Sequence, residues 1–222
     1  MADKVSIITP TYNCGDFIGE TIQSVLKQTY QNWEMIIVDD ASNDNTREIV
    51  EKYCEKDKRI KYYLLDQNSG AAVARTKAME LATGKYIAFL DSDDLWLPDK
   101  LEKQISFMEV NNYNFTCTAY EQVDEKGISL NKVIKTKPKT DYNGVLLSCP
   151  VGNSTVIYNA EALGKFVVPN IRKRNDDALW LQILKKEKYI YGMSDVLTKY
   201  RVRQDSLSSN KIELIKYHWK LY

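Results

Sequence analysis

The alternation of strand-like and helix-like segments in the first hundred residues constrains the fold more than any other feature. Short apolar runs typical of strands lie at 5–9, 33–38, 59–65 and 86–90, and apolar residues at helical spacing lie between them. Chains that alternate in this way form βαβ crossovers and a mostly parallel sheet with helices on both faces. We therefore expect an α/β fold.

Further elements are predicted after residue 90. They are a helix after Pro98, strands at 115–120, 154–158 and 196–202, a helix at 176–186, and an exposed hairpin or mobile loop at 121–143. In the first half, the helix at 71–82 is followed by Gly84, which we expect to occupy the C′ position that commonly ends a helix.

Charge and histidine content exclude several classes of function. The 222 residues carry 31 basic and 30 acidic side chains, and this net charge of +1 argues against a nucleic-acid binder. The charge is unevenly distributed, because residues 165–222 hold 13 basic and 6 acidic side chains. Because His218 is the only histidine, metal sites that need two or more histidines are excluded. Any metal must be held by carboxylates, which favours Mg²⁺ or Mn²⁺.

Cysteine usage and apolar runs indicate the compartment. Cys14, Cys54, Cys117 and Cys149 are widely spaced, which is typical of buried thiols in a reducing environment rather than of a disulfide framework. The chain enters its first strand without a signal sequence, and no apolar run approaches the ~20 residues of a membrane span. These features predict a cytoplasmic protein.

Three of the expected strands end in polar clusters, at 9–12, 39–40 and 91–94. In open α/β sheets, ligands bind outside the carboxyl ends of the strands, so these clusters predict one site. Asp91 and Asp93 are two residues apart and could hold a divalent cation together with substrate phosphates, although a solvated acidic turn is the alternative. Asp40 could accept hydrogen bonds from a base or a ribose, or could instead cap the next helix.

Four motifs resemble family 2 glycosyltransferases of the GT-A fold. They are Val-Ser-Ile-Ile-Thr-Pro-Thr-Tyr-Asn at 5–13, Ile-Val-Asp-Asp-Ala-Ser-Asn-Asp-Asn-Thr at 37–46, Asn-Ser-Gly-Ala-Ala-Val-Ala-Arg at 68–75 and Phe-Leu-Asp-Ser-Asp-Asp at 89–94. The match continues less tightly to about residue 209, and 199–209 resembles members that build bacterial surface polysaccharide or lipopolysaccharide. The resemblance implies transfer of a sugar from a nucleotide-diphosphate donor, with UDP expected, to an acceptor hydroxyl with inversion.

The resemblance also implies roles for individual residues. Asp93 would be the principal ligand of Mn²⁺ or Mg²⁺, and Asp91 would contact the metal or the ribose. The remaining residues expected to bind the nucleotide-sugar are Pro10, Thr11, Tyr12, Asp40, Asn68, Gly70, Arg75 and Ser92. Of these, Arg75 would lie near the base or the diphosphate, or would be a plain surface arginine.

The catalytic base is expected in the segment Asn-Asp-Asp-Ala-Leu-Trp at 175–180. The family carries E-D-x-x-x-W here, so Asp176 aligns with the family's aspartate, and Asn175 replaces the usual glutamate. Asp176 is the expected base, and Asp177 is the alternative. Arg201 or Arg203 could approach the diphosphate or a phosphorylated acceptor, or could lie on a solvated strand edge.

The resemblance divides the chain into a nucleotide-sugar-binding half at 1–98 and an acceptor-binding, catalytic half at 99–209 of one domain. Residues 210–222 are expected to form an amphipathic helix that contacts the inner face of the plasma membrane or packs on the domain. The expected partners are the donor and a glycan or lipid-linked saccharide acceptor, without nucleic acid; the oligomeric state is left open. Two other functions are considered, a sugar-nucleotide nucleotidyltransferase and an inert sugar-nucleotide-binding domain.

Overall fold

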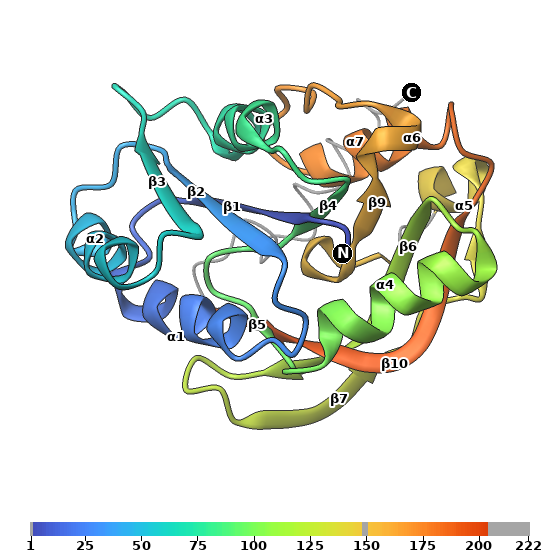
Figure 1. Ribbon diagram of the computed structural model, residues 1–222, viewed down its shortest axis with the longest axis horizontal. Helices are drawn as coiled ribbons and strands as arrows, with labels where there is room; N and C mark the ends of the chain where they lie inside the picture. The colour runs from blue at the N-terminus through green and yellow to red at the C-terminus, as the bar shows by residue number, and fades with distance from the viewer. Residues whose placement is uncertain (1, 148–150, 204–222) are drawn as a thin grey trace.

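The four strands predicted in the first hundred residues lie side by side and parallel in one ten-stranded sheet of the computed structural model (Figure 1). The structure describes residues 2–147 and 151–203, so the helix expected at 210–222 lies outside the described residues. The sheet order is β3-β2-β1-β4-β9-β6-β10-β5, with β7 on β6 and β8 on β10. The strands are β1 Val5–Thr11, β2 Trp33–Asp39, β3 Ile60–Leu64, β4 Tyr86–Phe89, β5 Leu95–Trp96, β6 Phe115–Val123, β7 Ser129–Ile134, β8 Lys139–Thr140, β9 Ile157–Asn159 and β10 Ile190–Arg201.

Helices cover both faces of this sheet, as the strand–helix alternation predicts. They are α1 Gly15–Leu26, α2 Thr46–Lys56, α3 Ala71–Leu81, α4 Lys100–Asn111, α5 Tyr142–Leu147, α6 Ala160–Leu163 and α7 Asn175–Ile183, with a 3₁₀ turn, η1, at Asn153–Thr155. In Figure 1, α1, α2 and α4 lie on one side of the sheet, and α3, α6 and α7 lie on the other. The expected α/β class with a parallel centre is confirmed.

The core consists of two apolar layers, one on each face. Neighbouring residues of β1 point into different layers, because successive strand side chains alternate: Ile7 packs with α1 and α4, whereas Ile8 packs with α3 and α7. Every residue of β1, β2 and β4 is buried. This two-sided burial explains why these strands appear in the sequence as continuous apolar runs rather than alternating ones.

The register of the parallel strands brings their carboxyl ends to a common edge. Thr11 of β1 lies opposite Asp39 of β2, and Asp39 lies opposite Leu64 of β3. The loops that follow β1, β2 and β4 therefore meet, which places the predicted polar clusters together.

The second half contributes antiparallel strands that the sequence pattern does not specify. β9 runs antiparallel to β4 and β6, so η1, which precedes it, lies at the edge where β4 ends. The strand expected at 154–158 therefore begins only at Ile157, because η1 occupies its first residues. The hairpin expected within 121–143 is present, since β6 pairs with β7 in antiparallel fashion.

Two details concern helices. α3 ends at Leu81 with Ala82 as its C-cap, so the expectation that Gly84 holds the C′ position is wrong. Gly84 is required for another reason, because a Cβ there would lie 2.6 Å from the carbonyl oxygen of Lys4 in the segment entering β1. Within the described residues, no helix combines the length and hydropathy needed to cross a membrane.

Candidate active site

Asp39 and Asp40, at the end of β2, are buried and organise the loops around them. Both oxygens of Asp40 accept backbone amides, from Ser69 at 2.7 Å and Gly70 at 2.8 Å. Gly70 is the N-cap of α3 and has a φ of 93°, a conformation that favours glycine. Asp40 therefore fixes the start of α3, whereas Asp39 accepts the amide of Ser42.

The loops after β1 and β2 are joined by hydrogen bonds. The amide of Asn13 donates to Ser42 Oγ, and Asn13 Oδ1 accepts the amide of Asn43. Asn13 and Ala41 both have left-handed φ values, 46° and 62°, which residues other than glycine adopt mainly where surrounding contacts enforce them. The preceding Tyr12 is 48% exposed at this rim. An exposed ring on a fixed loop can stack on a planar base.

The other residues expected to bind the nucleotide-sugar occupy the same edge in different environments. Pro10 and Thr11 are buried within β1, and the carbonyl of Thr11 accepts the amide of Asp40. Asn68 is exposed in the loop before α3. Only Tyr12 and Asn68 of these side chains are freely accessible.

Asp91, two residues after the end of β4, is held by three neighbours. Its Oδ1 accepts a hydrogen bond from Asn153 at 2.7 Å and one from Arg75 Nη2 at 3.1 Å, while its amide donates to Ser154 Oγ. Arg75 is only 5% exposed, and its Nη1 donates to Asn175 Oδ1 on α7. The guanidinium group therefore joins the end of β4 to the start of α7, so the surface-arginine alternative is wrong.

Electrostatics at Asp91 favour capture of positive charge. Burial raises the pKa of this carboxyl to about 6; Arg75 opposes the shift, and the nearby carboxylates of Asp93 and Asp176 add to it. Asp176, far away in sequence, is thus close enough to Asp91 to influence its ionisation.

Ser92, Asp93 and Asp94 continue the loop. The carbonyl of Ser92 accepts from Thr21 on α1, so Ser92 acts here through its backbone. Asp93 is partly exposed, and its Oδ2 pairs with Arg203 at 3.2 Å. Asp94 is 1% exposed and accepts both Ser154 Oγ and the amide of Arg201, which marks it as a structural residue.

Arg201 and Arg203 both reach the acidic loop from the end of β10. Arg201 is buried, donates from Nε to the carbonyl of Asp93 and pairs with Glu20 of α1 at 2.6 Å. The solvated-edge alternative is therefore wrong for Arg201. Both guanidinium groups lie over the ring of Phe17, at 4.9 and 4.6 Å from its centroid.

The first turn of α7 distinguishes the two candidate bases. Asp177 is buried and pairs with Arg174 Nε at 2.6 Å. Asp176 is half-buried, and its carboxylate makes no hydrogen bond or ion pair with any described residue. Arg174, which precedes this turn, has a left-handed φ of 61°, a strained conformation of the kind that clusters at functional sites. Asp176 is therefore the carboxylate available to a substrate.

Trp180 anchors this helix to the sheet. Its ring is fully buried and packs edge-on against Phe89, the last residue of β4, with centroids 5.0 Å apart. It also contacts Phe115 of β6. Phe89 lies two residues before Asp91, and Trp180 lies four residues after Asp176. The contact between the two rings therefore helps to set the position of one carboxylate relative to the other.

Comparison with known proteins decides the family. The sequence model described as Glycosyl transferase family 2 matches residues 6–158. The chain belongs to the family 2 glycosyltransferases. Membership makes it an enzyme and decides against the nucleotidyltransferase and the inert binding domain considered above.

Two curated family 2 relatives cover nearly the whole chain. The "Putative teichuronic acid biosynthesis glycosyltransferase TuaG" of Bacillus subtilis (strain 168) is 47% identical over 98% of this chain and 86% of its own length. The "UDP-Glc:alpha-D-GlcNAc-diphosphoundecaprenol beta-1,3-glucosyltransferase WfgD" of Escherichia coli is 43% identical over 97% of this chain and 83% of its own.

A solved structure confirms the GT-A architecture of the glycosyltransferase. S. aureus TarS 1-349 in complex with UDP superposes with a TM-score of 0.74 at 26% identity over 90% of this chain. The chain spans 61% of that TarS chain.

The candidate site includes three residues that the sequence analysis missed or undervalued. Asn153 and Ser154 bind Asp91 from η1, and Asn175 accepts from Arg75 in place of the family's glutamate. One signal was available, since Asn153-Ser154-Thr155 is a polar triplet leading straight into an apolar strand. This triplet points to the site only if β9 is known to run antiparallel to β4, because that direction places η1 beside the end of β4.

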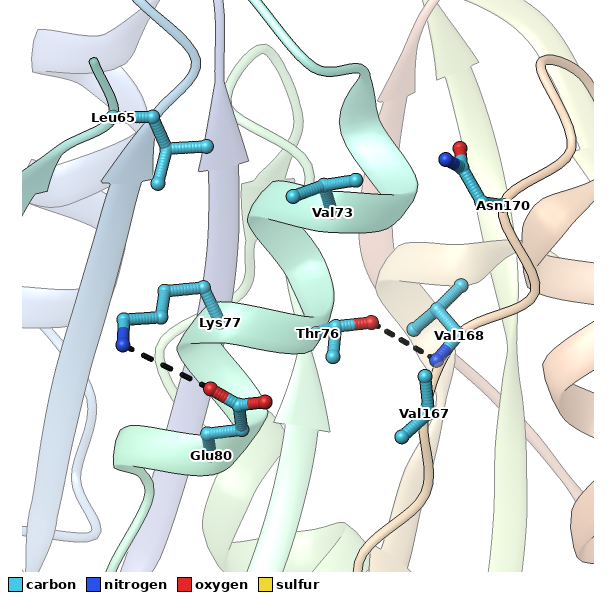
Figure 2. A pocket seen from close by; sticks show the side chains of 8 residues that line it. All are labelled: Leu65, Val73, Thr76, Lys77, Glu80, Val167, Val168 and Asn170. Carbon is cyan, nitrogen blue, oxygen red and sulfur yellow. Dashed lines mark hydrogen bonds and ion pairs between the residues drawn. The ribbon is translucent and has the colours of Figure 1, made fainter. Parts of the chain in front are cut away.

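A separate groove of about 260 Å³ lies along α3 (Figure 2). It is bounded by Val73, Lys77 and Glu80 of α3 and by the segment at 167–170, where the amide of Val168 donates to Thr76 Oγ1. No predicted site residue lines it, so we do not include it in the glycosyltransferase site.

Proposed function

We propose that this enzyme is an inverting, metal-dependent glycosyltransferase that moves a hexose from a UDP-linked donor to an acceptor hydroxyl on a lipid-linked or cell-surface glycan. One observation carries the proposal: Arg75 joins Asp91, just beyond β4, to the start of α7. The first turn of α7 holds Asp176, whose carboxylate has no partner in residues 2–147 and 151–203. Donor-side and base-side carboxylates therefore belong to one connected site.

The available donor atoms fit Mg²⁺ or Mn²⁺. Asp91 uses only Oδ1 toward its neighbours and Asp93 only Oδ2 toward Arg203, so each keeps one oxygen without a partner among the described residues. No group of three or more His, Cys, Asp or Glu side chains suited to a metal occurs in 2–147 and 151–203. Two carboxylates are sufficient, because these cations commonly complete their coordination with substrate phosphates and water.

The chemistry requires charge neutralisation on one side of the sugar and proton removal on the other. A divalent cation held by Asp91 and Asp93 would neutralise the charge that develops on the diphosphate leaving group. Arg203, paired with Asp93, adds a cationic group to the same side. Asp176 accepts the proton of the acceptor hydroxyl as that oxygen attacks the anomeric carbon, which inverts its configuration.

The metal role is tested by Asp93→Ala. We expect Mn²⁺-dependent transfer to fall by roughly a thousandfold or more, because the leaving group loses its counterion. The melting temperature should stay near that of the wild type, since Asp93 is partly exposed and anchors no core group. Release of nucleoside diphosphate measures turnover, and unchanged turnover contradicts the metal assignment.

The base is tested by comparing Asp176→Asn with Asp177→Asn. Asp176→Asn should lower the transfer rate by about 10²–10⁴-fold while donor binding persists, because general-base catalysis contributes this much. Asp177→Asn weakens the pair with Arg174, so it should lower the melting temperature and retain most of the rate. The opposite ranking of the two rates would assign the base to Asp177.

The proposed donor and acceptor rest on the relatives. WfgD is named for UDP-glucose and a diphosphoundecaprenol acceptor, and the TarS structure contains UDP. A thermal-shift panel of nucleoside diphosphates and UDP-, GDP- and dTDP-sugars, with and without Mn²⁺, tests the donor. A metal-dependent shift with UDP compounds supports the proposal, and one confined to GDP or dTDP compounds overturns it.

A further inference from the structure

The turn η1 contacts the acidic loop through its side chains. Asn153 Nδ2 donates to Asp91 Oδ1 at 2.7 Å. Ser154 Oγ accepts the amide of Asp91 at 3.0 Å and donates to Asp94 Oδ2 at 2.5 Å. A single 3₁₀ turn is a weak element by itself, so its position depends on the groups packed around it.

The carbonyl groups of η1 face the protein interior, where buried side chains donate to them. Trp96 Nε1 donates to the carbonyl of Ser154 at 2.7 Å, and Thr198 Oγ1 adds a longer bond of 3.3 Å to the same oxygen. Gln104 Nε2 of α4 donates to the carbonyl of Thr155 at 3.0 Å. Because an unsatisfied carbonyl at this depth is costly, these bonds restrict where η1 can lie.

Lys100 contacts two of these donors at once. Its Nζ donates to Gln104 Oε1 at 2.5 Å and lies 4.5 Å from the centroid of the Trp96 ring. Since Gln104 Oε1 accepts from this ammonium group, Nε2 is directed at the carbonyl of Thr155 and at Thr116 Oγ1. Lys100 therefore sets the orientation of the Gln104 amide.

Packing alone gives no reason for a lysine at this position. Lys100 is fully buried, and no carboxylate in 2–147 and 151–203 pairs with it. Burying an unpaired charge costs free energy, whereas an apolar side chain of similar length would fill the same space without that cost. A residue that costs stability and orients Gln104 fits a role in the geometry of the site.

We propose that Lys100, Gln104 and Trp96 are positioning residues for the candidate active site. They hold η1, and η1 holds Asp91 and Asp94 in the arrangement that binds the donor. The inference rests on the proposed function only where it assigns donor binding to Asp91. The position of the loop is measured separately.

Two variants test the proposal. Lys100→Met removes the ammonium group and keeps most of the volume, so the melting temperature should stay the same or rise. The double variant Lys100→Met/Gln104→Leu also removes the donor to Thr155. It should remain folded, because apolar groups replace the polar pair and no charge is left unpaired.

The first measurement is amide hydrogen exchange by NMR, without any ligand. The amide of Asp91 is bonded to Ser154 Oγ, whereas that of Ile36 lies at the centre of the sheet. Relative to Ile36, exchange at Asp91 should be about threefold faster in Lys100→Met and about tenfold faster in the double variant. A residue that served stability alone would not loosen the acidic loop in a variant whose melting temperature is unchanged or higher.

The second measurement is calorimetric titration with UDP, with and without Mn²⁺. The factor by which Mn²⁺ tightens UDP binding should fall by about tenfold in the double variant, since losing an outer-shell partner of a metal ligand commonly costs this much. UDP affinity without Mn²⁺ should stay near that of the wild type, because the variant removes no group expected to contact the nucleotide.

Ile105→Val is the matched control on the same helix. Ile105 follows Gln104, is 2% exposed and packs in the apolar layer. The variant should lower the melting temperature through lost packing. It should leave both the exchange of Asp91 relative to Ile36 and the effect of Mn²⁺ on UDP binding unchanged.

The outcomes separate this inference from the proposed function. Variants whose Asp91 amide exchanges as slowly, relative to Ile36, as in the wild type overturn the inference. Equal changes in Ile105→Val also overturn it, because any disturbance of α4 would then move the loop. If Asp91 exchanges faster in the variants but Mn²⁺ has no effect on UDP binding by the wild type, the positioning role is supported and the proposed metal role is contradicted.

Discussion

Arg75 illustrates how a single residue can join distant parts of a chain. Its guanidinium group lies inside the protein and is shared between Asp91, 16 residues away, and Asn175, 100 residues away. A buried charge needs such partners, because leaving it unpaired is costly. The resemblance to the family predicted a nucleotide-contacting role; the structure adds that this arginine positions the acidic loop against α7.

Gly84 gives a prediction at the same scale. Gly84→Ala should lower stability by about 1–3 kcal/mol, because the added Cβ would lie 2.6 Å from Lys4 O and 2.8 Å from Ser6 N, and backbone must shift. For a chain of this size, this corresponds to a decrease of roughly 2–4 °C in melting temperature per kcal/mol. Differential scanning calorimetry measures it.

Gly19→Ala is the matched control for that experiment. The nearest atom to its added Cβ is 3.7 Å away, an ordinary contact, and alanine favours the helix. Gly19→Ala should therefore leave the melting temperature unchanged or higher. Equal losses from both variants would show that close approach at Gly84 is not the cause.

Among the elements, α4 buries polar side chains against the sheet. Lys100 and Gln104 lie one turn apart and are both fully buried; Lys100 Nζ donates to Gln104 Oε1 and sits 4.5 Å from the ring centroid of Trp96. Burial lowers the pKa of Lys100 from 10.5 to about 7. The folded protein therefore releases this proton at a lower pH than the unfolded chain.

This shift predicts a pH dependence of stability. Between the folded pKa of about 7 and the unfolded value of 10.5, the unfolded chain holds more protons, so stability should rise with pH by up to about 1.4 kcal/mol per unit. Lys100→Met should remove this slope. The variant should gain most stability over the wild type below pH 7, where the buried lysine of the wild type is charged. Urea unfolding at pH values across this window measures the free energy of unfolding of the wild type and of the variant. If the two free energies change with pH in the same way, Lys100 does not titrate as a buried group.

The elements that could be predicted from the sequence are those with a local sequence signal. β1, β2 and β4 were predicted because burial on both faces produces continuous apolar runs, and α1 to α3 because each follows its strand directly. The direction of β9 was not predicted, since strand pairing across sixty or more residues leaves no local pattern. Asp91, Asp93 and Asp176 were predicted as site residues from strand ends and motifs, whereas the positions of Asn153 and Ser154 depend on that unpredicted pairing.

In the molecule as a whole, the carboxyl ends and the amino ends of the parallel strands have different roles. The carboxyl ends of the strands carry the candidate site, and the amino ends are held together by Glu34 of β2. Its carboxylate binds Ser6, Thr83, Lys61 and Lys4, and so connects β1, β2, β3 and the start of β4. Burial alone would raise the pKa of Glu34, but hydrogen bonds from Lys61, Ser6 and Thr83 outweigh it and lower the pKa to about 2.

Glu34 should therefore contribute to acid sensitivity. A depressed folded pKa stabilises the protein above the unfolded value of 4.5, and this contribution is lost as the pH falls toward 2. Glu34→Gln should lower the melting temperature by roughly 3–10 °C at pH 7, and the difference from wild type should narrow below pH 4.5. Glu48→Gln, on the exposed face of α2, should have little effect at any pH.

The placement of η1 and α7 has a consequence for synthesis of the chain on the ribosome. The strands that precede Asp40 and Asp91 emerge first. Asn153, which binds Asp91, lies 62 positions after it, and Asn175 lies 100 positions after Arg75. Within residues 2–147 and 151–203, β5 pairs with β10 alone, so the acidic loop between β4 and β5 is also bounded by a strand that is translated much later. A nascent chain therefore completes its first βαβ units long before its acidic loop gains its partners. The acidic loop can reach its final arrangement only after the chain has been synthesised through β10.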